Sequence, residues 1–365
     1  MKLQIIDTVD NKIIRSDNFN LLFNKKTGFT ATSGRTTDED ALMCPIGPTI
    51  CDIEISAGKC IGCQFCYKSN SQDLPIQNMS FETYKKIFNL LPRTVTQIAF
   101  GITTIENTPD LWKIMEYTRE NGVIPNLTIN GVNFTDYQAE RLAYLAGAVA
   151  VSCYSKDVCY DAVDKLVGFS HLGGATLRQI NIHQLLSANT YQNCFELIKD
   201  RKVDPRLQEL NAIVFLLLKP KGERNFYRGL NSQDDYELLI EFARIHNVQI
   251  GMDSCSAPLM LKAAEALEME EVIPSIQPCE STLESFYIDV NGRGFPCSFS
   301  AGTDDWKEGI NLLEVTNFTD EVWLGERVTA WRNKLLNSSS NCNCKFNKTC
   351  RSCPLYPEIN ICKGK

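Results

Sequence analysis

From residue 49 to about residue 253, short apolar stretches with strand character alternate with longer amphipathic stretches. Repeated strand-then-helix order is typical of a parallel sheet, and this many units predicts a full or partial TIM-like (β/α) barrel. Functional side chains are then expected where the strands end. The expected strands cover 49–55, 96–101, 124–129, 147–153, 177–183, 211–218 and 248–252. The expected helices cover 80–91, 109–121, 135–146, 157–167, 191–202 and 233–246.

The segments on either side of this repeat have a different pattern. Residues 2–31 alternate short apolar runs with turn signals, which predicts two β-hairpins, and residues 32–48 form a polar linker. Residues 286–297 predict a further hairpin, with an Asn-Gly turn. We therefore expect an α/β protein in three parts. They are N-terminal β-hairpins with a linker (1–48), the barrel (49–254), and a small cysteine-rich α+β extension (255–365).

Composition narrows the functional classes. The 365 residues carry a net charge of −7, which disfavours a large nucleic-acid footprint. No apolar run reaches about 18 residues, so no membrane span is expected. Sixteen cysteines without a secretion signal point to a reducing compartment, the cytoplasm, and to metal binding instead of a disulfide framework.

Three of these cysteines, Cys60, Cys63 and Cys66, lie within seven residues, directly after the first expected strand. Three thiolates so close together can converge on one soft metal centre, either zinc, copper(I) or an iron–sulfur cluster. A structural zinc site uses four protein ligands. A 4Fe–4S cluster held by three cysteines would leave one iron free to bind a small molecule.

This cysteine loop, with Phe65 and Tyr67 on either side of its last cysteine, resembles that of the radical S-adenosylmethionine (SAM) superfamily. The usual spacing there is C-x3-C-x2-C, whereas this chain has C-x2-C-x2-C. The resemblance implies that the open iron chelates SAM. Electron transfer then cleaves SAM to a 5′-deoxyadenosyl radical, which abstracts a substrate hydrogen.

The resemblance also implies SAM contacts at later strand ends. Gly101 and Thr103 stand where the family usually has Gly-Gly-Glu. Without the resemblance, serine and asparagine at strand ends, here Ser152 and Asn130, are more often turn formers, and His183 is more often a core histidine. The implied cofactor-binding residues are Phe65, Tyr67, Gly101, Thr103, Asn130, Ser152, His183 and Leu217.

The C-terminal cysteines resemble the SPASM extension of radical SAM enzymes, which carries two auxiliary 4Fe–4S clusters. Gly292-x4-Cys297 and the five-residue gap before Cys350 match that pattern, while the gaps on either side are shorter. Less closely, parts of the chain look like an uncharacterised group seen in phage-like sequences. A single auxiliary cluster, or a zinc site in the tail, is the alternative. Carried over, one cluster is held by Cys255, Cys279, Cys297 and Cys353, and the other by Cys342, Cys344, Cys350 and Cys362.

The loops after the fourth and seventh strands are expected to form the wall of the active-site mouth. Tyr154, Asp157 and Asp253 are candidate substrate-positioning groups, although the two acids could only cap the following helices. Cys153 is a candidate hydrogen donor to a substrate radical.

The resulting hypothesis is a radical SAM enzyme, of oxidoreductase type, that abstracts a hydrogen from a peptide or protein. An electron donor such as flavodoxin or ferredoxin would be its partner. The alternatives are radical SAM chemistry on a small molecule or on RNA, and a non-enzymatic zinc-binding protein.

Overall fold

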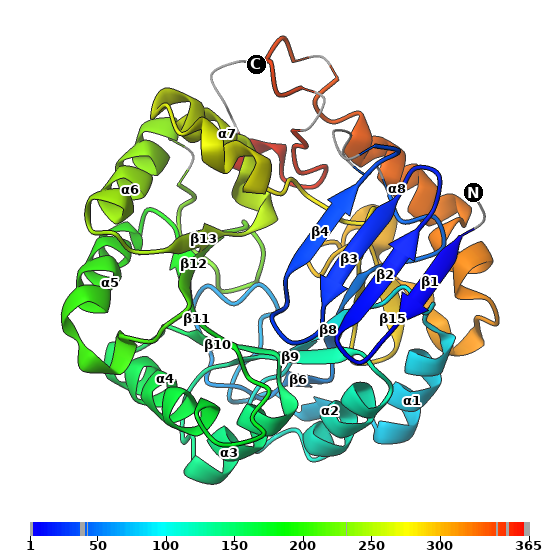
Figure 1. The fold of residues 1–365 in the computed structure, drawn as a ribbon, viewed down its shortest axis with the longest axis horizontal. Helices are drawn as coiled ribbons and strands as arrows, with labels where there is room; N and C mark the ends of the chain where they lie inside the picture. The colour runs from blue at the N-terminus through cyan, green and yellow to red at the C-terminus, as the bar shows by residue number, and fades with distance from the viewer. Residues whose placement is uncertain are drawn as a thin grey trace.

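The computed structural model describes residues 3–36, 41, 43–230, 232–340, 342–347 and 350–360. Strand and helix alternate through its middle, as the sequence predicts (Figure 1). The parallel strands of this repeat are β5 (Ile50–Glu54), β8 (Gln97–Gly101), β9 (Ile124–Ile129), β10 (Ala148–Ser152), β11 (Gln179–Leu186), β12 (Ala212–Leu217) and β13 (Ile250–Met252). The helices that follow them are α1 (Phe81–Leu90), α2 (Leu111–Glu120), α3 (Asp136–Leu145), α4 (Lys156–Ser170), α5 (Tyr191–Val203), α6 (Gln233–Ile245) and α7 (Ala257–Ala266).

The strands form a curved sheet with different residues on its two faces. Their order is β13-β12-β11-β10-β9-β8-β5, so neighbours in sequence are neighbours in the sheet. The residues on the outer face are fully buried against the helices, as Ile53 and Phe215 are. The inner face carries small and polar side chains that remain accessible, among them Asp52, Asn126 and Asn181. The predicted TIM-like barrel is therefore confirmed as a partial barrel with a hollow, polar interior.

Residues 3–33 form one sheet instead of two separate hairpins. The four strands β1 (Gln4–Asp7), β2 (Asn11–Arg15), β3 (Asn20–Asn24) and β4 (Thr30–Ser33) pair consecutively and antiparallel. The sequence pattern identified the strands but missed the pairing of β2 with β3, because the turn between them, Ser16 to Phe19, lacks the Asn-Gly signal of a tight hairpin.

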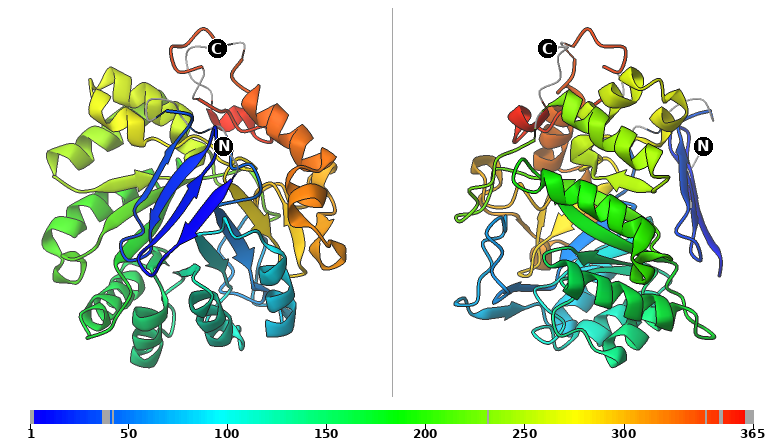
Figure 2. Two further views of the ribbon diagram at one scale, coloured as in Figure 1. Left: turned by 45° about the vertical axis from the view of Figure 1, so that its right-hand side comes forward. Right: turned by 90° about the vertical axis from the view of Figure 1, so that its left-hand side faces the viewer.

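This N-terminal sheet covers the amino end of the barrel. The Lys12 ammonium donates to the Val95 carbonyl oxygen at 2.6 Å, just before β8. The Gln179 side chain, at the start of β11, donates to the carbonyl of Thr27 at 2.9 Å. Figure 2 shows the sheet (blue) at the opposite end of the molecule from the segment around residues 56–78 (lighter blue).

The C-terminal extension continues the barrel sheet. Its first strand, β14 (Ser285–Ile288), lies parallel to β5, and β15 (Arg293–Phe295) and β16 (Ile310–Asn311) follow antiparallel. The predicted Asn-Gly hairpin is confirmed as β14 and β15. Helix α8 (Glu326–Leu336) then covers this end of the sheet, with the tail between α8 and α7 (Figure 1). Within the described ranges, no helix is long and apolar enough to cross a membrane.

Phe286 joins β14 to the helical segment that contains Phe318 and Trp323, so we expect its truncation to lower the stability of the protein strongly. Its ring is 1% exposed and lies 5.4 Å from Phe318 and 6.5 Å from Trp323, between ring centroids. Phe286→Ala should lower the free energy of unfolding by about 3 to 5 kcal/mol, because the cavity left cannot collapse fully. Urea unfolding followed by tryptophan fluorescence measures this. Phe29→Ala, at a position 59% exposed, is the matched control and should change stability by less than about 0.5 kcal/mol.

Candidate functional site

The three-cysteine loop leaves the carboxyl end of β5 through a short antiparallel ribbon. The ribbon pairs β6 (Ser56–Gly58) with β7 (Ile76–Asn78). Gly58 adopts φ +87°, and a Cβ there would lie 2.0 Å from the Pro75 carbonyl oxygen. Only glycine therefore allows the strands to close and form the base of the loop.

Inside this loop the thiols of Cys60, Cys63 and Cys66 lie close enough to influence one another. Burial, followed by the neighbouring Cys60 and Cys66 sulfurs, raises the pKa of Cys63 to about 11. Burial also raises the pKa of Cys60, so holding Cys60 and Cys63 as thiolates requires a positive centre. No three acidic, histidine or cysteine side chains of the described residues are spaced to hold a single metal ion. A 4Fe–4S cluster is larger, and each of its cysteines binds a different iron, so the donor set fits such a cluster.

Polar groups from the next strands lie against the same loop. The Thr103 hydroxyl is 2.8 Å from the hydroxyl of Ser56, and its carbonyl oxygen is 3.5 Å from the Cys60 sulfur. The Asn130 amide donates to that carbonyl oxygen at 3.2 Å. The structure thus brings Thr103 and Asn130 together beside the cysteines, and Gly101 leads into Thr103 at the end of β8.

Aromatic rings line the loop on two sides. The Phe65 ring lies 5.6 Å from Tyr154, after β10, and 5.3 Å from Tyr227, after β12. The Tyr67 ring lies 4.4 Å from Phe299 in the C-terminal extension. These contacts place aromatic rings beside the partly exposed cysteines, while Tyr154 itself is 47% exposed at the mouth.

A segment that the sequence prediction missed, residues 218–230 after β12, packs directly on the cysteine loop. Gly222 adopts φ +107°, and a Cβ there would lie 2.3 Å from the Cys66 carbonyl oxygen. The Ser69 hydroxyl accepts the Glu223 backbone N–H at 2.9 Å. The sequence did contain one sign that this segment is special. It is long for a connection between a strand and a helix of a barrel.

The end of β5 is also fixed by a charged contact with β14. The Glu54 carboxylate accepts hydrogen bonds from the Lys68 ammonium at 3.2 Å and from the Tyr287 hydroxyl at 2.9 Å. Lys68 follows the last cysteine by two residues, so β14 helps to hold the far end of the loop.

A second group of thiols forms where the barrel meets the extension. Cys255 follows β13, Cys279 and Cys297 flank β14 and β15, and Cys353 comes from the tail. Burial raises the pKa of Cys297 to about 11, and the Cys353 sulfur adds to the shift. Cys279 and Cys353 likewise contribute to the raised pKa of Cys255, after burial. The structure thus brings together the four cysteines that the resemblance assigned to one auxiliary cluster.

A buried ion pair joins this second group to the segment after β12. The Lys219 ammonium, on a side chain 4% exposed, pairs with the Asp253 carboxylate and also lies beside the Cys255 sulfur. The Ser256 hydroxyl donates to the same carboxylate at 2.8 Å. Asp253 is therefore engaged by a cation and a hydroxyl, and its side chain does not cap the helix that follows.

Comparisons with known proteins give structural relatives only, since no protein-family model and no curated protein matches the sequence. Streptococcus suis SuiB bound to its precursor peptide SuiA superposes with a TM-score of 0.72 at 13% identity, over 96% of this chain and 95% of SuiB. SuiB bound to SAM gives 0.66 at 15% identity, over 84% and 73%. The enzyme anSMEcpe with AdoMet and a Cp18Cys peptide gives 0.57 at 14% identity, over 84% and 90%.

The chain has the radical SAM fold. The position of its three-cysteine loop, at the carboxyl end of the first barrel strand, is the position that the resemblance predicted.

Three other residues that the sequence predicts for the site of this radical SAM fold lie at or next to the ends of β10 and β11. Ser152 and His183 end up side by side in the register of β10 and β11. Burial lowers the pKa of His183 to about 4, which keeps its ring neutral. The Cys153 sulfur accepts a hydrogen bond from the Cys159 thiol, which lowers the pKa of Cys153.

Two predicted residues do not face the site. Leu217 shares the outer, helix-facing side of β12 with Phe215, and the barrel-facing position is Leu216. Asp157 is 87% exposed and lies 3.5 Å from the Arg206 guanidinium on the surface. In the tail, Cys344 lies beside the Lys262 side chain of α7, Cys342 and Cys350 follow α8 along the chain, and Cys362 is outside the described residues.

The Lys219–Asp253 pair predicts a stability loss that depends on charge. Lys219→Met should lower the free energy of unfolding by roughly 3 kcal/mol, because a mostly buried carboxylate loses its partner. Lys219→Met combined with Asp253→Asn should recover part of that loss. Urea unfolding measures both, with exposed Lys202→Met as control. Equal losses in the single and double variants would contradict the pairing.

Proposed function

We propose that this protein is a radical SAM enzyme that abstracts a hydrogen atom from a peptide or protein substrate. The observation that carries the proposal is the convergence of Cys60, Cys63 and Cys66 at the carboxyl end of β5. These three cysteines would hold a 4Fe–4S cluster. Such a cluster, with SAM bound, would supply a 5′-deoxyadenosyl radical.

The residues around this loop divide the remaining tasks. Thr103, Asn130 and Ser152 supply polar groups to orient SAM, and Leu216 is the barrel-facing leucine of β12 in place of Leu217. Phe65 and Tyr67, with their ring partners, exclude water, which matters because a carbon radical reacts with any nearby hydrogen donor. Gly101 and His183 complete the inner wall of the proposed SAM site.

A peptide substrate is supported by two observations. SuiB and anSMEcpe, which share the fold, have been crystallised with peptides. The inner face of this barrel is hollow and lined by accessible polar side chains, so a chain segment has room to enter. Tyr154 and Cys153, at the mouth, are the proposed substrate-facing residues. Asp253 acts with Lys219 to position the adjoining loops.

We also propose that Cys255, Cys279, Cys297 and Cys353 bind an auxiliary 4Fe–4S cluster. Their convergence from three separate segments supports this, because four thiols form a closed ligand set. A second auxiliary cluster on Cys342, Cys344, Cys350 and Cys362 remains a prediction, as does a flavodoxin or ferredoxin as electron donor.

Removing the three-cysteine loop ligands tests the main proposal. The triple change of Cys60, Cys63 and Cys66 to alanine should remove about four irons per chain and abolish the reductive cleavage of SAM. Iron analysis and chromatography of 5′-deoxyadenosine measure the two effects. Cys51→Ala, in the buried outer face of β5, should keep both. Continued 5′-deoxyadenosine production by the triple variant would refute the proposal.

The auxiliary site has its own test. Changing Cys255 and Cys279 together to alanine should also lower the iron content by about four per chain. The cluster proposed on Cys60, Cys63 and Cys66 should still cleave SAM. Cys194→Ala, on the buried face of α5, is the control and should leave the iron content unchanged. An unchanged iron content in the double variant would rule out the four-cysteine assignment.

A further inference from the structure

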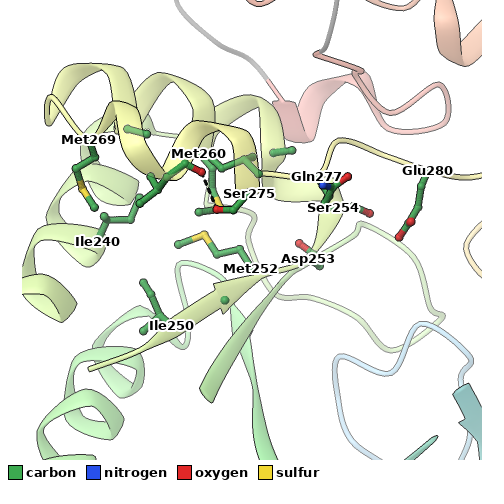
Figure 3. Close-up of a pocket in the computed structure, with 15 residues that line it drawn as sticks. Ile240, Ile250, Met252, Asp253, Ser254, Met260, Met269, Ser275, Gln277 and Glu280 are labelled. Atoms are coloured by element: carbon green, nitrogen blue, oxygen red, sulfur yellow. Dashed lines mark hydrogen bonds between the residues drawn. The ribbon is translucent and has the colours of Figure 1, made fainter. Parts of the chain in front are cut away.

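A cavity of about 440 Å³ lies at the free edge of the barrel sheet, beside β13 (Figure 3). It lies between β13, α6, α7 and the short 3-10 segment Glu270–Ser275, and it is partly open to solvent. This volume falls within the range of ligand pockets and is far larger than the voids that close-packed protein cores retain.

The cavity has an apolar end and a polar end. Met252, Met260 and Met269 point into it together with Ile240 and Ile250, as Figure 3 shows. Methionine side chains are flexible and polarisable, so they adapt to apolar groups of different shapes. Asp253, Ser254 and Glu280 lie at the other end.

The residues at the polar end lie close to side chains of the barrel interior. Glu280 lies close enough to Asp52, on the inner face of β5, for the Asp52 charge to contribute to its raised pKa, after burial and Glu284. Asp253 similarly lies near His183, on the inner face of β11. We call the cavity the side chamber and its polar end the neck. The neck faces the space where the proposed radical chemistry takes place.

The two carboxylates at the neck, those of Asp253 and Glu280, differ in the groups that contact them. Asp253 is held by Lys219 and Ser256, whereas the Glu280 carboxylate accepts no side-chain hydrogen bond in the described part of the chain, although the Arg351 charge acts on it and opposes the rise of its pKa. Glu280 is thus an acceptor available to an N–H group that approaches the neck from the barrel.

We propose that this side chamber binds an apolar side chain of the peptide substrate, of leucine, methionine or phenylalanine size, while Glu280 accepts a backbone N–H of the same segment. The inference rests on the proposed function and specifies the substrate as a peptide with a large apolar residue near the reacting one. The chamber selects by burial of apolar surface, and the carboxylate fixes the direction of the chain.

The test uses the cluster-loaded enzyme with SAM and three probes: the N-acetyl amides of leucine, phenylalanine and aspartate. Saturation-transfer NMR measures their binding. The leucine and phenylalanine probes should bind at millimolar concentration and the aspartate probe at least tenfold more weakly. Ala264→Phe, which fills the chamber from α7, should weaken the apolar probes at least tenfold. Ala266→Phe, at an exposed position of the same helix, should leave them unchanged.

A second variant covers the case in which the filled chamber does not fold. Met269→Gln keeps the side-chain volume but places an amide in the apolar end, so it should also weaken the apolar probes. Unchanged binding in Met269→Gln, equal binding of all three probes, or displacement of the apolar probes by SAM would overturn the proposal. If the enzyme fails to cleave SAM, the proposed function fails instead, and the two failures are told apart by the 5′-deoxyadenosine assay.

Discussion

A single buried ion pair connects the two groups of cysteines. A charge taken out of water is tolerated only when it is paired and hydrogen-bonded, and Lys219 meets this condition through Asp253. The pair fixes the carboxyl ends of β12 and β13 relative to each other. On one side it positions Cys255, two residues after Asp253. On the other side it anchors the segment in which Gly222 packs against Cys66. The spacing between the two proposed metal centres therefore depends on this contact.

The two ends of the barrel have separate roles. At the amino end, the N-terminal sheet contributes its own apolar cluster, which includes Phe19, Phe23 and the first residue of β9, Ile124. At the carboxyl end, the contacts are short hydrogen bonds, ion pairs and ring pairs around the cysteines. This arrangement separates the residues that stabilise the barrel from those of the proposed site, as parallel α/β barrels generally do. The hollow inner face reduces the buried apolar area available to the barrel, so the N-terminal sheet compensates with area of its own.

Much of the fold could be predicted from the sequence because the information is local. The apolar runs of the seven parallel barrel strands and the amphipathic helices between them agree with the structure to within a few residues, and the motif Cys60 to Cys66 is recognisable from its spacing alone. Leu217 shows the limit. In the continuous apolar run 212–218, alternation does not tell which residues face inward, so the neighbouring Leu216 takes the inner position. Lys219, Glu280 and the β5–β14 pairing were missed because their partners lie far away along the chain, where local patterns carry no information.

The pairing of β5 with β14 also has a consequence for how the chain is made. Thr49, directly before β5, contacts Glu284, directly before β14, across a separation of 235 residues. At ordinary translation rates, β5 waits on the order of 10 to 50 s for this neighbour after it leaves the ribosome. During that interval one edge of β5 and the adjoining cysteine loop are open. Emergence of β14, and not emergence of the cysteines, therefore sets the moment at which the contacts around the loop of the proposed metal cluster can be completed.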